Sequence, residues 1–242
     1  MTTPRPRILL VHGAWVGAWE FAPIIPILQE RGWQVDALDL PTTGSTLPMT
    51  ADADAITAAL TAADGPVVLI GHSYGGVPIT QAGDHPNVER VVYVAAFAPD
   101  AGESVVEALG GQLPPTWATA DGQVSLGADR ADRIEIIAAD FPPGAPREAA
   151  EALADMFRPQ SEASLAEPVT RVAWRSKPST YIFTENDGVL PPAFQESQVA
   201  RMASSGVDVV RIAHGHAPFQ EDPAGFADLV ERIADAAQVS RS

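Results

Sequence analysis

The chain is organised around residues 66–76, which read Pro66-Val-Val-Leu-Ile-Gly71-His-Ser-Tyr-Gly-Gly76. Residues 66–70 are short, apolar and β-branched, which predicts a strand buried on both faces. Residues 77–82 can continue as a helix. A strand that enters a Gly-x-Ser-x-Gly turn and leaves as a helix holds its serine at a sharp bend. The alternative is a glycine-rich turn that only happens to contain a serine. We expect Ser73 to be a nucleophile exposed above the carboxyl edge of a sheet.

The composition is that of a globular protein without cysteine chemistry. The chain has 242 residues, of which 46% are hydrophobic, and this length suits one α/β domain or two small ones. It contains no cysteine, which excludes disulfides, thiolate metal sites and a cysteine nucleophile. No Walker-type or dinucleotide-binding motif occurs, so no cofactor is expected.

The charge balance limits the expected partners. There are 31 acidic and 15 basic residues, for a net charge of −16. A surface without a basic stripe is unsuited to nucleic acid. No apolar run approaches the roughly 20 residues of a membrane span, and the amino terminus lacks the apolar region of a signal peptide. We therefore expect a cytoplasmic protein with a small-molecule partner, no nucleic-acid or membrane partner, and leave open a homodimer.

Strand and helix patterns alternate along most of the chain. This cadence predicts a mostly parallel sheet with helices on both faces. The expected strands are residues 7–12, 34–40, 66–70, 88–96, 179–184 and 207–212. The expected helices are residues 21–31, 50–63, 77–82, 192–204 and 222–237.

The cadence breaks between about residues 101 and 177. Proline and glycine pairs punctuate three expected helices there, near residues 129–139, 146–157 and 162–166, and no buried-strand pattern occurs. An insertion of helices between strands predicts a helical lid over the strand ends, within a single domain of residues 1–242. We expect Trp117, Phe141 and Phe157 of this lid to line a substrate pocket, although about half of the lid's apolar side chains would serve only to pack it onto the core.

A serine nucleophile needs a base and an acid from other loops at the same sheet edge. A histidine must take the hydroxyl proton, and a carboxylate must hold that histidine. Two histidines follow the last strand, His214 and His216. Asp187 follows the strand before it, and Asp100 follows residues 88–96.

Four segments resemble the α/β-hydrolases. They are His12-Gly-Ala-Trp15 with Gly17-Ala-Trp19, Gly71-His-Ser-Tyr-Gly-Gly76, Asp187 with Pro191 and Gln195, and Gly215-His-Ala-Pro-Phe219. The resemblance covers essentially the whole chain and is strongest to the esterase and hydroxynitrile lyase group, which includes plant methyl esterases and bacterial pyrethroid-hydrolase-type carboxylesterases. It implies the chain order Ser73, Asp187, His216 for the catalytic triad, and favours Asp187 over Asp100 and His216 over His214.

The resemblance also implies how the oxyanion would be held. The two backbone N–H donors would come from Ala14 and Tyr74, with Gly13 letting the first loop turn close to the serine. His12 is expected to orient this loop. His72 is expected to point away from the site and to pack in the core.

Two positions separate the chemistries of the group. Hydroxynitrile lyases carry a threonine and a lysine where this chain has Gly13 and Ala217. The resemblance therefore favours hydrolysis of small to medium, neutral, hydrophobic carboxylic esters over lyase chemistry. Cofactor-free perhydrolase or haloperoxidase activity, and a non-enzymatic small-molecule binding protein that retains the triad, remain as alternatives.

Overall fold

The structure is a computed structural model that describes residues 5–140 and 146–239. Its centre is a six-stranded sheet in the order β2-β1-β3-β4-β8-β9, and every neighbouring pair is parallel. The strands are β1 (Arg7–Val11), β2 (Val35–Leu38), β3 (Val67–His72), β4 (Val88–Val94), β8 (Ser179–Thr184) and β9 (Asp208–Ile212). Each overlaps a strand predicted from the sequence, so the α/β prediction is confirmed.

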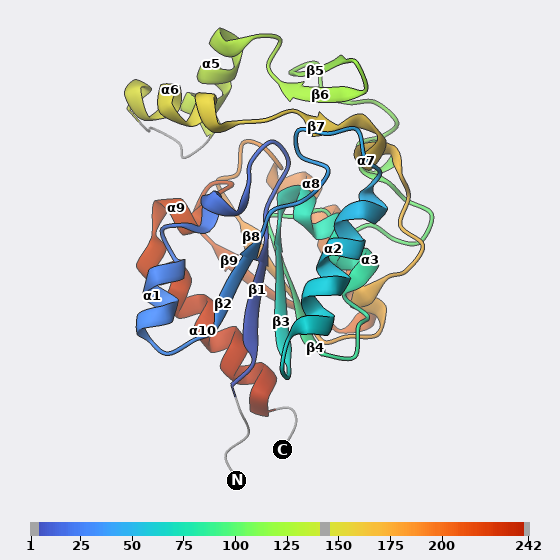
Figure 1. Ribbon diagram of the computed structural model, residues 1–242, viewed down its shortest axis with the longest axis vertical. Helices are drawn as coiled ribbons and strands as arrows, with labels where there is room; N and C mark the ends of the chain where they lie inside the picture. The colour runs from blue at the N-terminus through green and yellow to red at the C-terminus, as the bar shows by residue number, and fades with distance from the viewer. Residues whose placement is uncertain (1–4, 141–145, 240–242) are drawn as a thin grey trace.

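Helices cover both faces of this sheet (Figure 1). Along β3, Val67 and Leu69 face one apolar cluster while Val68 and Ile70 face the other, which is why the strand is apolar throughout. The longer helices are α1 (Ile25–Glu30), α2 (Met49–Ala62), α3 (Gly76–Ala82), α8 (Pro192–Met202) and α10 (Pro223–Val239). The short ones are η1 (Ala18–Phe21), η2 (Ser73–Gly75), η3 (Ala173–Arg175), η4 (Ala203–Ser205) and α9 (Pro218–Glu221).

The segment between β4 and β8 forms a layer above the sheet, at the top of Figure 1. It contains α4 (Val105–Ala108), β5 (Trp117–Ala120), β6 (Gln123–Leu126), α5 (Arg130–Asp140), α6 (Arg147–Met156), β7 (Gln160–Ser161) and α7 (Glu162–Ala166). The three helices expected near residues 129–139, 146–157 and 162–166 are present as α5, α6 and α7.

The insertion also contains strands, which the absence of a buried-strand pattern did not predict. Strands β5, β6 and β7 form a small antiparallel sheet. Asp121 and Gly122 connect β5 to β6, with φ of 51° and 74°. An Asp-Gly pair with both φ positive is the turn that best fits a two-residue hairpin, so the hairpin had a signal in the sequence.

The return segment of the insertion is bonded to the loop after β2. The N–H of Gly44 donates to the carbonyl of Pro159 at 2.7 Å, and the amide of Gln160 donates to the hydroxyl of Thr42 at 2.7 Å. Gln160 and Thr42 are both fully buried. A buried polar group is costly without a partner, so these bonds fix where the insertion rejoins the sheet. Over the described part of the chain, no helix combines the length and apolarity needed to cross a bilayer.

Candidate active site

Ser73 lies at a strained bend between β3 and α3. Its φ is 52°, a region that side chains other than glycine seldom adopt. A Cβ atom on Gly75 would lie 2.6 Å from the carbonyl oxygens of both Val11 and His12. Only glycine therefore allows the turn to approach β1 this closely. The bend leaves Ser73 8% exposed at the carboxyl edge of the sheet.

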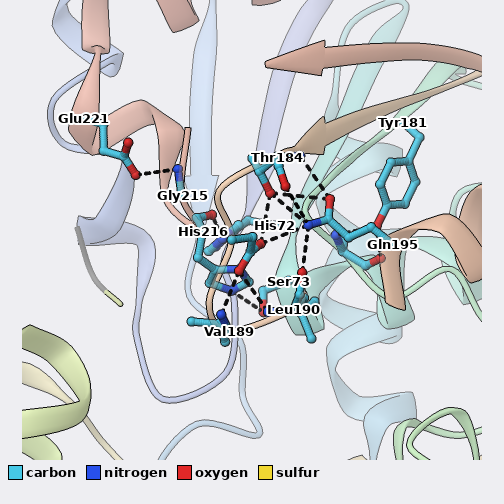
Figure 2. A network of polar contacts seen from close by, with 12 residues as sticks. His72, Ser73, Tyr181, Thr184, Val189, Leu190, Gln195, Gly215, His216 and Glu221 are labelled. Atoms are coloured by element: carbon cyan, nitrogen blue, oxygen red, sulfur yellow. Dashed lines mark hydrogen bonds and ion pairs between the residues drawn. The ribbon is translucent and has the colours of Figure 1, made fainter. Parts of the chain in front are cut away.

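Ser73, His216 and Asp187 form a hydrogen-bonded series, as Figure 2 shows for Ser73 and His216. The Nε2 atom of His216 lies 3.0 Å from Oγ of Ser73, and its Nδ1 lies 2.8 Å from Oδ2 of Asp187. A carboxylate only accepts, so Nδ1 carries the hydrogen and Nε2 of a neutral His216 accepts from the serine hydroxyl. This geometry can remove the serine proton.

Asp187 is almost completely buried yet well supplied with donors. Burial raises the pKa of Asp187, but His216 and the surrounding hydrogen bonds lower it more, so the net pKa lies below the usual value. The other donors are the N–H groups of Val189 and Leu190, the hydroxyl of Thr184 and the amide of Gln195. Asp187 therefore stays ionised beside His216.

The rival acid and base lie elsewhere. Asp100 pairs with Arg175, with 2.6 Å between the guanidinium and the carboxylate. His214 lines a separate hollow with Pro218 and Asp222. Its Nδ1 atom is buried and has no partner among the described residues. Neither side chain joins the cavity beside Ser73.

A small cavity, partly open to solvent and with about 20 Å³ of space for the centres of water-sized molecules, lies beside Ser73 and His216. Its walls are mostly apolar and come from the loop after β1 with η1, the serine turn after β3, the carboxyl-terminal part of α6 with the residue after it, and the segment from His216 into α9. They are Gly13, Ala14, Trp15, Val16, Trp19, Glu20, His72, Ser73, Leu153, Phe157, His216, Ala217 and Gln220. No cluster of three or more metal-ligating side chains occurs in the described ranges.

The three lid residues predicted to line the pocket have different outcomes. Phe157 lies in the cavity wall. Trp117 does not: its ring packs edge-on against Trp15, 4.6 Å between centroids, and Trp15 rather than Trp117 lines the cavity. Phe141 lies outside the described residues.

The loop after β1 passes directly against the serine. A Cβ atom on Gly13 would lie 3.1 Å from Cβ of Ser73, and Ala14 lines the same cavity. Nε2 of His12 accepts from the N–H of Leu40 at 2.9 Å, so its Nδ1 carries the hydrogen and donates to the carbonyl of Gly13 at 2.7 Å. His12 thus ties this loop to the end of β2.

The side chain of Tyr74 is hydrogen-bonded to the buried carboxylate of Asp52. Its hydroxyl donates to Asp52 at 2.7 Å, and Thr42 donates to the same carboxylate through its N–H and its hydroxyl. Burial and the charge of Asp52 raise the pKa of Tyr74 well above its usual value, so the phenol stays protonated. Because Gln160 bonds to Thr42, this network joins the insertion to the residue after Ser73.

The expectation that His72 points away from the site is wrong. Its ring lies 4.7 Å from that of His216 and borders the cavity. Its partner Glu20 is 2% exposed and was not among the predicted site residues. A single glutamate in a partly apolar helical stretch resembles an ordinary surface residue, so no local signal could have found it.

A parallel sheet with this serine elbow, histidine and aspartate at its carboxyl edge is the architecture of a hydrolase of the α/β type. Residues 8–229 match the alpha/beta hydrolase family, and the chain belongs to that family. The resemblance predicted from the sequence motifs is thereby confirmed.

Several relatives align over almost their whole length. A probable hydrolase, R7, from Phoma sp. is 32% identical over 95% of this chain and 98% of its own. Methylesterase 2 from Arabidopsis thaliana is 27% identical, covering 96% and 97%. The crystal structure of a pyrethroid hydrolase from Sphingobium faniae is 25% identical and matches with a TM-score of 0.79 over 96% and 98%.

Proposed function

We propose that this protein is a serine esterase that hydrolyses small to medium, neutral, hydrophobic carboxylic esters through an acyl-enzyme. One observation carries the proposal: Nε2 of His216 lies 3.0 Å from Oγ of Ser73 while its Nδ1 lies 2.8 Å from Asp187. A serine hydroxyl is a weak nucleophile until such a base removes its proton.

Each residue has a defined part in the proposed reaction. Ser73 attacks the ester carbonyl and passes its proton to His216, whose positive charge Asp187 stabilises. The tetrahedral intermediate then breaks its bond to the alcohol, which leaves with the proton from His216. Water, activated by His216 in the same way, releases the acid and restores the serine.

The negative oxygen of the intermediate needs donors beside the serine. The backbone N–H groups of Ala14 and Tyr74 are the candidates, because the first lies in the loop against Ser73 and the second begins the turn after it. Each donor of this kind contributes about 2.7–4 kcal/mol in the transition state.

The cavity supports the substrate class. Its largest walls are the aromatic rings of Trp15, Trp19 and Phe157. Such walls favour the transfer of apolar groups from water. The relatives named methylesterase, pyrethroid hydrolase and carbendazim hydrolyzing esterase point to esters as well.

The same cavity disfavours the lyase alternative. Gly13 and Ala217 both line it, at the positions where the resemblance implies a threonine and a lysine in hydroxynitrile lyases. Neither residue offers a cation or a hydroxyl to a departing cyanide. Ester hydrolysis needs neither a cation nor a hydroxyl at these positions, because its leaving group departs as a neutral alcohol.

A panel of p-nitrophenyl esters from acetate to octanoate tests the proposal. We expect the short esters to turn over, and Ser73→Ala to lower kcat at least about 1,000-fold. Ser205→Ala, at an exposed serine in η4, is the control and leaves kcat unchanged. Failure of a fluorophosphonate probe to label Ser73, together with no ester turnover, would refute the esterase.

A further inference from the structure

A second carboxylate–imidazole pair lies beside the triad. Both carboxylate oxygens of Glu20 lie 3.2 Å from Nδ1 of His72. The opposite nitrogen, Nε2 of His72, lies 2.9 Å from the carbonyl oxygen of His216. Glu20 also accepts from the N–H of Gly13, at 3.1 Å. The pair thus connects the loop after β1 to the backbone of the triad histidine.

The hydrogen bonds define how this pair is protonated. A carbonyl oxygen only accepts, so Nε2 of His72 carries a hydrogen. The carboxylate of Glu20 accepts from the N–H of Gly13 and faces Nδ1 of His72 with both oxygens. A second hydrogen, on Nδ1, then makes His72 an imidazolium that faces the carboxylate of Glu20. The side chains of His72 and Glu20 are each only 3% exposed.

The charges around His72 favour this assignment. Burial lowers the pKa of His72, but the charge and hydrogen bond of Glu20 raise it more, so the net pKa lies above its usual value of 6.5. The titratable groups that face His72 are Glu20 from η1, His216 from the loop after β9 and, at longer range, Asp187 from the loop after β8.

We propose that Glu20 and His72 form a buried ion pair that positions the loop of Gly13 and the backbone of His216 against Ser73. Glu20 is then a positioning residue for the esterase reaction, so this inference rests on the proposed function. A buried ion pair is often no more stabilising than apolar residues of the same volume. What distinguishes this pair is that its outer hydrogen bonds end on the two segments that must be placed beside the serine.

The two ends have different tasks in the proposed reaction. Gly13 precedes Ala14, whose N–H would hold the oxyanion, and His216 supplies the base. A displacement of about 1 Å in such groups costs on the order of 100-fold in rate. Loss of the hydrogen bonds that Glu20 makes to Gly13 and His72 should therefore lower kcat and leave KM nearly unchanged.

Two substitutions at Glu20 compare the loss of its hydrogen bonds with their retention in an uncharged side chain. Glu20→Ala removes both contacts, and we expect kcat for p-nitrophenyl acetate to fall about 10- to 100-fold with KM within about twofold. Glu20→Gln can still donate to Nδ1 of His72 and accept from Gly13, and we expect kcat within about fivefold of the wild type. The control is Tyr93→Phe, which removes a buried hydroxyl contact with Thr80 away from the cavity. It lowers Tm without changing kcat.

The ¹⁵N NMR spectrum of histidine-labelled protein tests the pair without any substrate. At pH 6.5, the usual pKa of histidine, we expect the wild type to show a mainly imidazolium ring for His72 and Glu20→Gln to show a neutral one. A neutral His72 in the wild type, or Glu20→Ala with kcat within twofold of the wild type, would overturn the proposal. If the wild type neither hydrolyses esters nor labels at Ser73, the proposed function fails, while the NMR result still decides the ion pair.

Discussion

Gly75 is the residue at which one added methyl group tests the arrangement of the serine turn. In Gly75→Ala the new Cβ would lie 2.6 Å from the carbonyl oxygens of Val11 and His12. Ordinary contact begins near 3.4 Å, and both oxygens belong to backbone that cannot rotate away. The turn and β1 must therefore separate by about 0.8 Å.

This separation moves Ser73 away from the loop that carries Gly13 and Ala14. Overpacking of this size costs about 1–3 kcal/mol in the free energy of unfolding. A shift close to 1 Å between nucleophile and oxyanion donors lowers kcat on the order of 10- to 100-fold. Steady-state hydrolysis of p-nitrophenyl butyrate, with urea unfolding on the same preparation, measures both quantities.

Gly206→Ala separates the effect on the site from the loss of stability. Gly206 has a φ of 71° and open space around it, far along the chain after α8. Alanine there costs about 1–2 kcal/mol because of the left-handed backbone, and kcat should not change. A folded Gly75→Ala variant with the wild-type kcat would refute the idea that close packing of the turn against β1 places the nucleophile.

Three further expectations follow from the same geometry. Asp187→Asn should lower kcat about 1,000- to 10,000-fold, because the histidine loses the carboxylate that holds its tautomer; a fall below tenfold would count against the triad. The lowered pKa of Asp187 stabilises the folded state above about pH 4, and this contribution is lost as the pH falls through the folded-state pKa. The free energy of unfolding, measured in urea at acid pH, should therefore depend less on pH in Asp187→Asn. Phe157→Ala should raise kcat/KM for octanoate over acetate about 3- to 10-fold by opening the cavity wall, and an unchanged ratio would place the acyl chain elsewhere.

The raised pKa of His72 gives a pH dependence of opposite sign. Its contribution to the free energy of unfolding is complete below about pH 6.5 and is lost as the pH rises through the folded-state pKa. Glu20→Gln removes the charge that raises this pKa. Urea unfolding between pH 6 and 9 should therefore show a decline with pH in the wild type that is smaller in Glu20→Gln; parallel curves would contradict the assignment.

The sheet and the serine turn were predictable because their signals are local. The apolar run of β3 and the glycines after it define a strand, a bend and a helix within a dozen residues. The helices of the insertion were found because prolines mark their ends. Strands β5 and β6 escaped since each has only four residues. The Asp121-Gly122 pair between them was the sequence feature that indicated a hairpin.

Side-chain placement depended on distances that no spacing encodes. Trp117 was expected in the pocket as an aromatic side chain of the lid, yet it packs edge-on against Trp15, which itself lines the cavity. Glu20 and His72 are 52 positions apart in the chain, and only the closure of the sheet brings them together. Sequence periodicity predicts which face of a helix or strand a residue occupies, but it does not predict which side chain it contacts there.

The strand order has a consequence for how activity returns during refolding. Strands β1, β3 and β4 bring together the nucleophile and the loop of Gly13, while the acid and the base arrive with β8 and β9 after the long insertion. Ser73 and His216 are separated by 143 positions. Pairing over such a separation is slow, because the intervening chain must first be closed into a loop. The time course of fluorophosphonate labelling at Ser73 during refolding therefore reports when β8 docks on β4. This labelling should start later than the recovery of the helical signal.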